Sequence, residues 1–335
     1  MRILVLLRDQ SPNGITTYNR IVAEHLRHQG HVVDVWPPAP GWRRALPLHR
    51  WSVPLLSGAV KGFQPDLIFI SHYTQAELAA SLSQQLGVPW VACMHNGHSP
   101  ARMAQWKALF GSAAGVVTMC ENLHQKYSQL IGASRPSVLL SRLPIAAPLL
   151  APRGQGPLTL AYCSRMSGQK GPRCAAWLRA VASLPEAQEF KVRVIGGGSY
   201  LPQLKSLAQE LKLAVEFTGL VPDASPYLAD VDVMTGAGYA LMEGMVRGAS
   251  AVALGFAGCW GAVTAENFHR AVAVNFGDHC DTPLPEDAQA LAAALQQAIA
   301  LRRGDGAERL TALARQHFDA PTVVSELADY FQALR

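Results

Sequence analysis

The stretch Asp232-Val-Met-Thr-Gly-Ala-Gly-Tyr-Ala-Leu-Met-Glu-Gly-Met-Val-Arg-Gly248 indicates the end of a strand, a tight glycine loop and then a helix. Gly236 and Gly238 allow the backbone to turn sharply and to approach a ligand. Residues 240–247 hold strong helix formers, and N–H groups at the start of such a helix favour an anion. Glu243 lies one to two turns inside, where its carboxylate can reach a hydroxyl group beside a bound phosphate. Taken alone, the stretch is equally compatible with a plain turn and a surface Glu.

The length and composition predict a globular protein of two domains. The chain has 335 residues, 49% hydrophobic and 16% charged, so each half can build a substantial core. No apolar run is long enough to span a membrane, and the apolar residues 3–7 lack the cleavage pattern of a signal peptide. Six scattered cysteines without metal-type spacing predict a reducing, cytoplasmic setting. The net charge of +5 favours an anionic ligand or an anionic membrane surface, and no nucleic-acid-binding motif occurs.

The first half of the chain alternates between expected strands and helices. Such alternation predicts an α/β domain with a parallel sheet, whose ligands collect at the carboxyl ends of the strands. Gly14 follows the first expected strand, and His95 follows another, so both are candidate site residues, with a purely structural His as the alternative. The expected strands are 3–7, 32–36, 66–70, 89–94, 115–119 and 138–140, and the helices 16–27, 74–86 and 121–130.

Two segments interrupt this pattern. Residues 37–56 combine prolines with the basic and aromatic side chains of the Trp42–Trp51 segment. This segment suits a membrane interface or an anionic acceptor, but its prolines break a long amphipathic helix and favour an ordinary connection. The Pro- and Gly-rich residues 143–157 are the clearest composition shift in the chain and predict the interdomain linker, placed at 146–157.

The second half repeats the alternation and adds cations at a strand end. Arg165 and Lys170 flank a loop that must turn at Gly168 and Gly171. Arg165 can grip a diphosphate as a fork and Lys170 as a point charge, and two solvated surface cations are the alternative. The expected strands are 158–162, 192–195, 215–218, 231–234, 250–254 and 271–275, with 255–264 as a loop. The expected helices are 173–184, 201–211, 224–230, 240–247, 287–303 and 306–334, the last broken at 319–321.

This combination resembles the GT-B glycosyltransferases, and within them the large retaining family 4, along nearly the whole chain. The resemblance implies two Rossmann-like parallel-sheet domains facing across a cleft. Arg165 and Lys170 match the family's pair for the donor diphosphate, and Glu243 matches its carboxylate for the nucleotide ribose. His95 falls where the family has a His near the transferred sugar. Further segments match the first-domain glycine loop at 13–15 and the nucleoside-side segments 196–198 and 217–219, which include Gly14, Gly197 and Gly219.

One departure from the family concerns its Glu-x7-Glu motif. Glu243 is the second Glu, but the first, which in the family contacts the donor sugar, falls at Thr235 in a loop that looks shortened. We expect Gly236, Gly238 and the glycine-rich residues 258–264 to take over part of this site. The chain therefore resembles a shortened-loop subgroup of the family.

The resemblance implies a retaining glycosyltransferase that uses a nucleotide-diphosphate sugar. His95, Arg165 and Lys170 are the expected catalytic residues, with Gly14, Gly197, Gly219, Gly236, Gly238 and Glu243 as donor-binding residues. No obligatory metal is expected, because Asp230-Val-Asp232 belongs to a helix-to-strand entry. A nucleotide-sugar epimerase and a non-catalytic nucleotide-sugar binder are the alternatives.

The expected organisation has an acceptor-side domain and a donor-binding domain. Residues 1–145 form the first, with helix 321–335 packing back on it, and residues 158–320 form the second. The acceptor is unidentified, with a glycan, a lipid-linked molecule or a small molecule as alternatives. The expected location is cytoplasmic, with peripheral attachment at the inner membrane surface as one option, and the oligomeric state is open.

Overall fold

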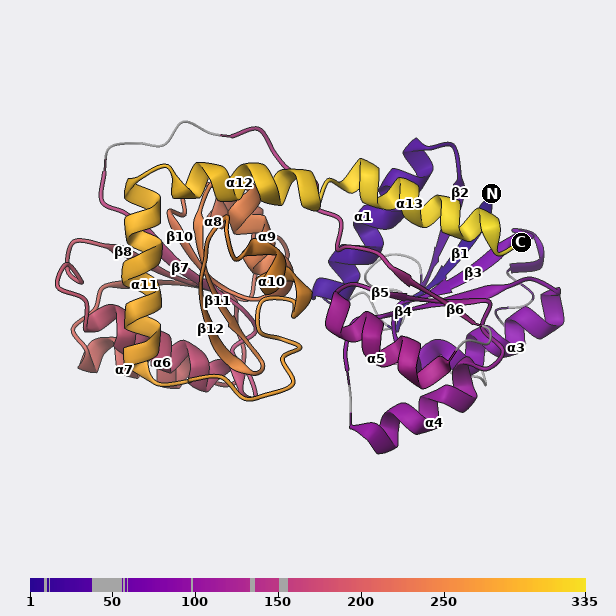
Figure 1. The fold of residues 1–335 in the computed structure, drawn as a ribbon, viewed down its shortest axis with the longest axis horizontal. Coiled ribbons are helices and arrows are strands. Elements are labelled where there is room, and N and C mark those ends of the chain that lie inside the picture. Colours follow the sequence, from indigo (N-terminus) through magenta and orange to yellow (C-terminus); the bar gives the residue numbers. More distant parts are fainter. Residues whose placement is uncertain are drawn as a thin grey trace. The chain divides into compact units, whose positions relative to one another are not determined.

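A computed structural model describes the chain except residues 9, 10, 12, 38–55, 57, 59, 98, 133–135 and 151–155. The described residues form two compact units (Figure 1). The first comprises Met1–Ala146 and Phe318–Arg335, and the second comprises Ala147–His317. The Trp42–Trp51 segment and part of the predicted linker lie outside the described residues.

The first unit is built on a parallel sheet with the strand order β2-β1-β3-β4-β5-β6. All six expected strands are confirmed, and the four inner strands are buried along nearly their whole length because helices cover both faces. The strands are β1 (Arg2–Leu6), β2 (Val32–Trp36), β3 (Leu67–Ile70), β4 (Trp90–Met94), β5 (Gly115–Thr118) and β6 (Ser137–Leu140).

Helices from both ends of the chain cover one face of this sheet. Phe69 of β3 contacts Tyr18 of α1 (Gly14–His28) and Phe331 of α13 (Ala320–Ala333). α1 and α13 lie side by side in Figure 1. The predicted break at 319–321 is confirmed: α12 (Gly306–His317) ends before it, and the Asp319 carboxylate caps α13 by accepting the Thr322 N–H at 3.1 Å.

The other face of the first sheet carries a helix that the sequence pattern did not predict. Trp90 of β4 faces Phe110 of α4 (Pro100–Phe110), and Phe110 in turn contacts Tyr127 of α5 (Glu121–Ile131). α4 buries only a narrow apolar stripe, so its helical period is weak in the sequence. The short helix η2 (Tyr73–Gln75) and α3 (Ala76–Leu86) complete this side.

The second unit is built on a mainly parallel sheet with the order β12-β11-β10-β7-β8-β9. Its parallel strands confirm the predicted class, and only β12 runs antiparallel, paired with β11. The strands are β7 (Thr159–Cys163), β8 (Lys191–Ile195), β9 (Val215–Gly219), β10 (Val233–Gly236), β11 (Ser250–Gly255) and β12 (Gly258–Val263).

Two expectations for the second unit were wrong. The expected loop 255–264 contains β12, which forms a hairpin with β11 across Phe256 and Ala257. The expected strand 271–275 is instead the end of α10 (Phe268–Ala273) and a turn after it. Phe268, Ala271 and Val272 are buried at helical spacing, so the short apolar run belongs to a helix face.

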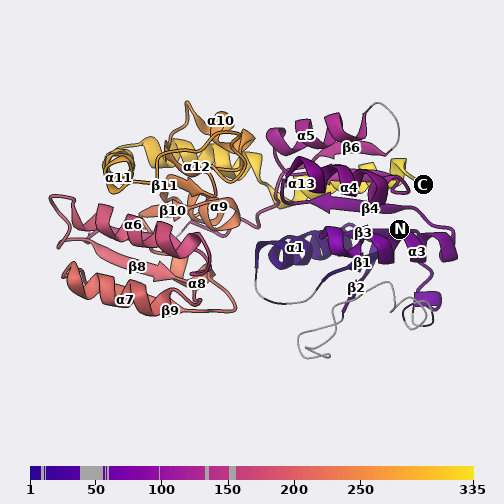
Figure 2. The ribbon, with the colours of Figure 1, turned by 90° about the horizontal axis from the view of Figure 1, so that it is seen from below.

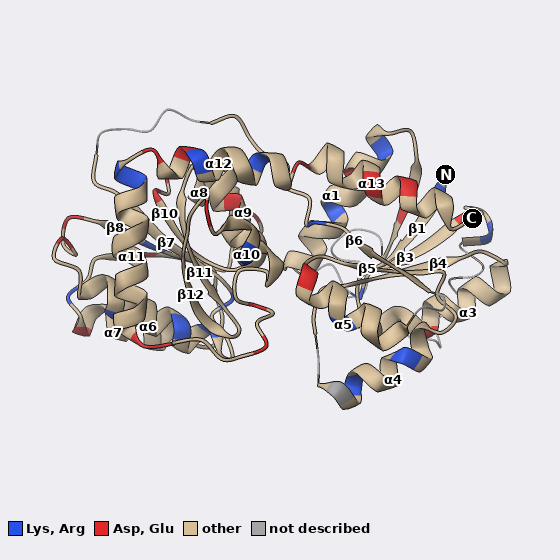
Figure 3. Cartoon of the chain, viewed as in Figure 1, with Lys and Arg blue, Asp and Glu red and all other residues tan. Residues whose placement is uncertain are grey.

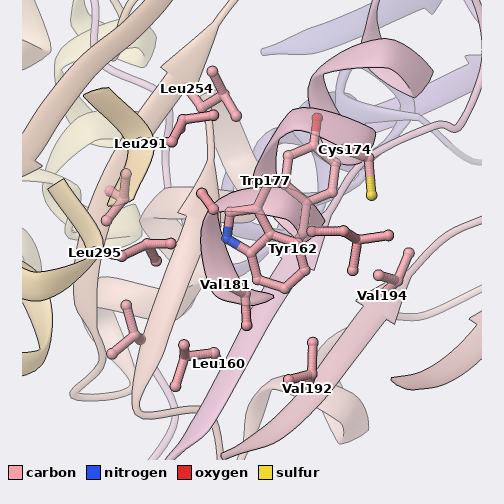
Figure 4. Packing of buried hydrophobic residues seen from close by; sticks show 14 of the residues in the cluster. Leu160, Tyr162, Cys174, Trp177, Val181, Val192, Val194, Leu254, Leu291 and Leu295 are labelled. Carbon is pink, nitrogen blue, oxygen red and sulfur yellow. The ribbon is translucent and has the colours of Figure 1, made fainter. Parts of the chain in front are cut away.

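The main core of the second unit lies between its sheet and the helices α6 (Lys170–Ala182), α7 (Leu201–Glu210) and α11 (Ala288–Arg303). Trp177 of α6 lies at its centre among aliphatic side chains from the sheet and α11 (Figure 4). α6 and α7 are in contact and run side by side (Figure 2). α8 (Ser225–Leu228), α9 (Gly238–Val246) and α12 complete the unit, with α9 packed on β10 and β11.

Charged residues are concentrated on the helices and loops (Figure 3). β10 and β11, two inner strands of the second sheet, contain none. Within the described ranges, no helix is long and apolar enough to cross a membrane.

Candidate functional site

The loops after β7, β8 and β9 are joined at the carboxyl edge of the second sheet. The Ser164 N–H donates to the Ile195 carbonyl at 3.0 Å, and the Met166 N–H donates to the Gly197 carbonyl at 2.9 Å. The Tyr200 N–H donates to the Met166 carbonyl at 2.8 Å. Arg165 lies on this framework as an exposed side chain, so the framework fixes the backbone that carries it.

The glycines of the 196–198 run are required by the packing of these loops. A Cβ on Gly196 would lie 2.0 Å from the Ser164 carbonyl oxygen, and one on Gly198 would lie 2.4 Å from the Met166 carbonyl oxygen. A Cβ on Gly197 would lie 2.7 Å from the Leu220 nitrogen. The close approach that the sequence predicted is therefore made, at least in part, by neighbouring backbone.

Gly219 ends the next strand with a φ of +69°, in the left-handed region that favours glycine. It forms a bridge with Gly196, and its carbonyl accepts the Thr218 hydroxyl at 2.9 Å. Gly197 and Gly219 thus belong to one group of strand-end turns, and their predicted contact with a nucleoside stays a prediction.

Lys170 is the first residue of α6 and lies at the same edge of the sheet. Its Nζ is 4.8 Å from the centroid of the Phe256 ring, which belongs to the β11–β12 turn. Such a cation–π contact fixes the ammonium group while leaving its donors available to a ligand. Arg173, one turn further along α6, donates to the Phe256 carbonyl at 2.7 Å. The start of α6 and the β11–β12 turn are therefore held together at the site.

The glycine loop of the β10–α9 junction has the predicted form. Gly236 and Gly238 have φ values of +156° and +56°, and α9 begins at Gly238, so the strand leads into the helix through Ala237 alone. Ala237 occupies the N-cap position with extended backbone, and an alanine side chain has no acceptor for the first N–H groups of α9. Ala237 therefore supplies no side-chain cap to α9.

Glu243 and Lys170 act on a common neighbour, the Cys163 thiol at the end of β7. Burial, together with the Glu243 carboxylate, raises the pKa of Cys163 to about 12, and the Lys170 ammonium opposes this rise. The thiol is therefore protonated at neutral pH. Lys170 begins α6 after β7, and Glu243 lies in α9 after β10. Because β7 and β10 are neighbouring parallel strands, both helices start from the same edge of the sheet.

Thr235, where the resemblance expects a Glu, points into the core. It is fully buried, and its hydroxyl accepts the Trp177 indole N–H at 3.0 Å. Its strand neighbours Tyr162 and Val252 belong to the same core cluster. A side chain at this position therefore faces α6 and not the carboxyl edge of the sheet.

A carboxylate that the sequence analysis missed, Asp278, lies at the same edge. It follows three consecutive residues in the left-handed region: Asn275 (φ 48°), Phe276 (φ 58°) and Gly277 (φ 89°). For the two non-glycine residues this conformation costs roughly 1–2 kcal/mol each. Burial raises the pKa of Asp278, while the nearby charges of Lys170 and Arg173 lower it. The apolar run 271–275 hides this signal, because its pattern predicts a strand in place of the end of α10 and the turn after it.

The two candidate residues of the first unit lie at the carboxyl ends of its strands. His95 directly follows β4, and its ring meets the Tyr18 ring edge-on at 4.8 Å. Gly14 is the first residue of α1, but the Asn13 side chain already accepts the Ile15 and Thr16 N–H groups at 2.9 and 3.1 Å. The first turn of α1 is therefore capped, unlike that of α9.

The acidic pair around Val231 lies at the opposite end of β10 and has structural partners. Asp232 accepts from Arg302 Nε and from the Thr159 N–H, both at 2.9 Å, and Asp230 forms an ion pair with Arg193. In the part of the chain that the structure describes, no group of three His, Cys, Asp or Glu side chains is arranged to hold a metal ion.

Two family models match the chain, one on each half. The model for a glycosyl transferase 4-like domain matches residues 13–144, and the model for glycosyl transferases group 1 matches residues 157–300. No curated protein sequence matches.

Solved structures share the fold along the whole chain at low sequence identity. HepE from Anabaena is 18% identical, with a TM-score of 0.72 over 99% of this chain and 100% of that chain. Sucrose-phosphate synthase from Thermosynechococcus elongatus is 17% identical, with a TM-score of 0.73 over 100% and 99%. A glycosyltransferase from Rickettsia africae is 14% identical, with a TM-score of 0.72 over 99% and 98%. These likenesses confirm the predicted GT-B class of two Rossmann-like parallel-sheet domains.

Proposed function

Because this chain belongs to the glycosyltransferases, joining a glycosyl transferase 4-like domain to a group 1 domain in the GT-B fold, we propose that it transfers a sugar with retention from a nucleotide-diphosphate sugar to an acceptor. HepE from Anabaena has been crystallised with UDP, and with UDP-glucose. This supports a nucleotide sugar as donor and makes UDP-glucose the first compound to test.

One observation carries the proposal: α6, which begins at Lys170, and α9, which contains Glu243 and has no acceptor on its N-cap residue Ala237, follow the paired strands β7 and β10 at one edge of the sheet. The α9 N–H groups and the Lys170 ammonium suit the two charges of a departing diphosphate. Fixed donors aimed at charge that develops in the transition state are often the largest catalytic contribution. Glu243 lies in the second turn of α9, where its carboxylate accepts hydrogen bonds from the ribose hydroxyl groups.

The remaining candidates have supporting roles in this proposal. Arg165 binds the diphosphate through its guanidinium group from the β7–α6 loop. Gly219 leaves room for the nucleoside, and Gly197 allows the strand-end turns beside it to pack closely. His95 orients the transferred sugar from the first domain, and Gly14 lies in that domain's glycine loop. No metal is required in this mechanism, because the helix start and two cations supply the positive charge.

We assign residues 1–145 with helix 321–335 to the acceptor side and residues 158–320 to the donor side, joined by a linker at 146–157. The acceptor is a glycan, a lipid-linked molecule or a small molecule. We place the protein in the cytoplasm, at the inner membrane surface if the acceptor is lipid-linked. The six cysteines remain thiols, four of them buried, which supports a reducing compartment.

The proposal is tested by following nucleotide release and product formation with UDP-, GDP-, ADP- and CDP-sugars and a panel of acceptors. Lys170→Ala should lower kcat/KM by about 100-fold, because it removes charge stabilisation of the leaving group. Arg165→Ala should also lower kcat/KM. Glu243→Gln should mainly weaken donor binding, by about tenfold, since it removes a charged hydrogen-bond acceptor. The anomeric configuration of the product, read by NMR, tests retention.

Lys205→Ala and Glu210→Gln are matched controls, because both residues are exposed on α7 in the same unit. These variants should turn over at the wild-type rate. If Lys170→Ala and Arg165→Ala also do so, the diphosphate assignment is wrong. Sugar interconversion without an acceptor would instead indicate an epimerase.

A further inference from the structure

The turn at residues 275–278 is built to hold the Asp278 carboxylate in one place. The Phe276 side chain is fully buried, and its N–H donates to the Ala271 carbonyl at 2.8 Å. The His279 N–H donates to the Val274 carbonyl at 3.0 Å, and the Ala257 N–H donates to the Gly277 carbonyl at 2.9 Å. Left-handed residues held in place by their surroundings cluster at ligand sites. This turn is therefore a candidate part of a ligand site.

The carboxylate of Asp278 lies beside the first turn of α9. Oδ1 accepts the Phe256 backbone N–H at 3.0 Å, and Oδ2 lies 3.5 Å from the side-chain nitrogen Nδ2 of Asn275. Oδ2 would be 3.8 Å from a Cβ on Gly238, the first residue of α9. Because Gly238 has no side chain, the space between the carboxylate and the start of the helix stays open.

A second glycine brings this turn to the sheet edge. A Cβ on Gly255, the last residue of β11, would lie 2.2 Å from the Gly277 carbonyl carbon and 2.4 Å from the Asp278 nitrogen. Lys170 is also close, since its charge lowers the pKa of Asp278 and its ammonium lies over the Phe256 ring. Asp278 is thus a member of the cluster that contains Lys170 and the α9 start.

The chemistry of this position limits what Asp278 can bind. A carboxylate repels a diphosphate. Asp278 can therefore contribute to the binding of a nucleotide sugar only by accepting hydrogen bonds from N–H or O–H groups of that molecule. It offers about four acceptor positions, and Phe256 and Asn275 occupy at most two of them. Beside the diphosphate of a nucleotide sugar, the available donors are the hydroxyl groups of the sugar. The Thr235 side chain does not accept hydrogen bonds from these hydroxyl groups, because it is buried against Trp177.

We propose that Asp278 accepts a hydrogen bond from a hydroxyl group of the transferred sugar and so contributes to sugar specificity. This inference rests on the proposed function, because it needs a nucleotide sugar at the α9 start. It assigns the sugar-reading carboxylate to a turn that lies 43 residues after Thr235 in the sequence.

Asp278→Asn tests the inference, because the amide can keep the acceptor for the Phe256 N–H while losing the charge. Binding of UDP alone and of UDP-glucose is measured by calorimetry, or of the matching pair from the donor panel if another nucleotide sugar is used. UDP affinity should stay within about twofold of wild type. UDP-glucose affinity should fall by about tenfold, since a hydrogen bond to a charged acceptor is lost.

Asp281→Asn is the matched control, because Asp281 is exposed in the same loop, and it should change neither affinity. If Asp278→Asn does not fold, Asp278→Glu keeps the charge, moves the carboxylate by one methylene, and should weaken UDP-glucose but not UDP. Equal weakening of UDP and UDP-glucose would overturn the inference, because Asp278 would then act through Lys170. Unchanged UDP-glucose affinity would overturn it as well. If wild type binds UDP and no nucleotide sugar, the proposed function fails together with the inference.

Discussion

Thr235 shows how one residue distinguishes this chain from the pattern it resembles. The expected motif carries a Glu at this position, but the side chain here accepts the indole N–H of Trp177 at 3.0 Å inside the core. β10 pairs with β7 and β11, and the neighbours of Thr235 on them, Tyr162 and Val252, also face that core. A carboxylate at 235 would be buried among apolar side chains, so the threonine matches its surroundings.

Restoring the family residue should therefore harm the protein. We expect Thr235→Glu to lower the free energy of unfolding by about 3 kcal/mol or more, because it buries an unpaired charge. Thr235→Val, which only leaves the Trp177 N–H unsatisfied, should cost about 1–3 kcal/mol. Urea unfolding measures both. A Thr235→Glu variant as stable as wild type and faster in transfer would show that position 235 faces the donor.

At the scale of elements, the two helix starts nearest the predicted glycine loops differ in their capping. The Asn13 side chain accepts from the first N–H groups of α1, whereas Ala237 at the N-cap of α9 has no side-chain acceptor to offer. An N-cap acceptor usually stabilises a helix by about 1 kcal/mol. A helix whose N-cap residue supplies no acceptor suits an anion at its start, as in other helix N-terminal anion sites.

Supplying a cap to α9 should increase stability and weaken donor binding. Ala237 already has the extended backbone of an N-cap residue, so Ala237→Asp should stabilise the protein by about 0.5–2 kcal/mol. Its carboxylate would occupy the place of the phosphate, and UDP affinity should fall by at least about tenfold. Thermal unfolding and calorimetry measure the two effects.

Asp287→Ala provides the matched control, because Asp287 caps α11 in the same unit by accepting the Ala290 N–H at 2.8 Å. Removing that cap should cost about 1 kcal/mol and leave UDP affinity unchanged. UDP binding as strong in Ala237→Asp as in wild type would contradict an anion site at the start of α9.

At the scale of the whole molecule, the chain leaves the first unit and returns to it. The second unit is a continuous segment, whereas residues 318–335 rejoin the first unit. The Ile145 N–H donates to the Phe318 carbonyl at 2.8 Å, Phe331 packs on Phe69 at 5.1 Å, and Tyr330 donates to the Ser137 carbonyl at 2.9 Å. The last helix therefore completes the core of the first unit.

Truncating Phe331 should destabilise the first unit alone. Phe331→Ala removes a fully buried ring and should cost about 3–5 kcal/mol. Hydrogen exchange should show β1 and β3 losing protection while β7 and β10 keep theirs. The exposed Gln332→Ala serves as control and should change neither set. Loss of protection confined to the second sheet would contradict the assignment of α13 to the first unit.

The parts that the sequence predicted well are those with strong local signals. The glycines and apolar residues around 236–243 were sufficient to predict the strand, loop and helix that the structure contains. α4 and β12 were missed because a narrow apolar stripe and a glycine-rich hairpin carry little periodicity. The run at 271–275 was misread because a short apolar segment fits a strand and a buried helix face equally well.

Apart from α4, β12 and α10, the sequence by itself determined the chain order of strands and helices, and with it which loops end on the carboxyl edge of each sheet. That followed because hydrophobic periodicity and glycine punctuation are local properties. Only the tertiary structure decided that Thr235 faces the core and that Asp278 faces the start of α9. The direction of a strand side chain depends on which helices cover each face, and the place of Asp278 depends on a left-handed turn packed against Gly255. Both are set by contacts between residues distant in sequence.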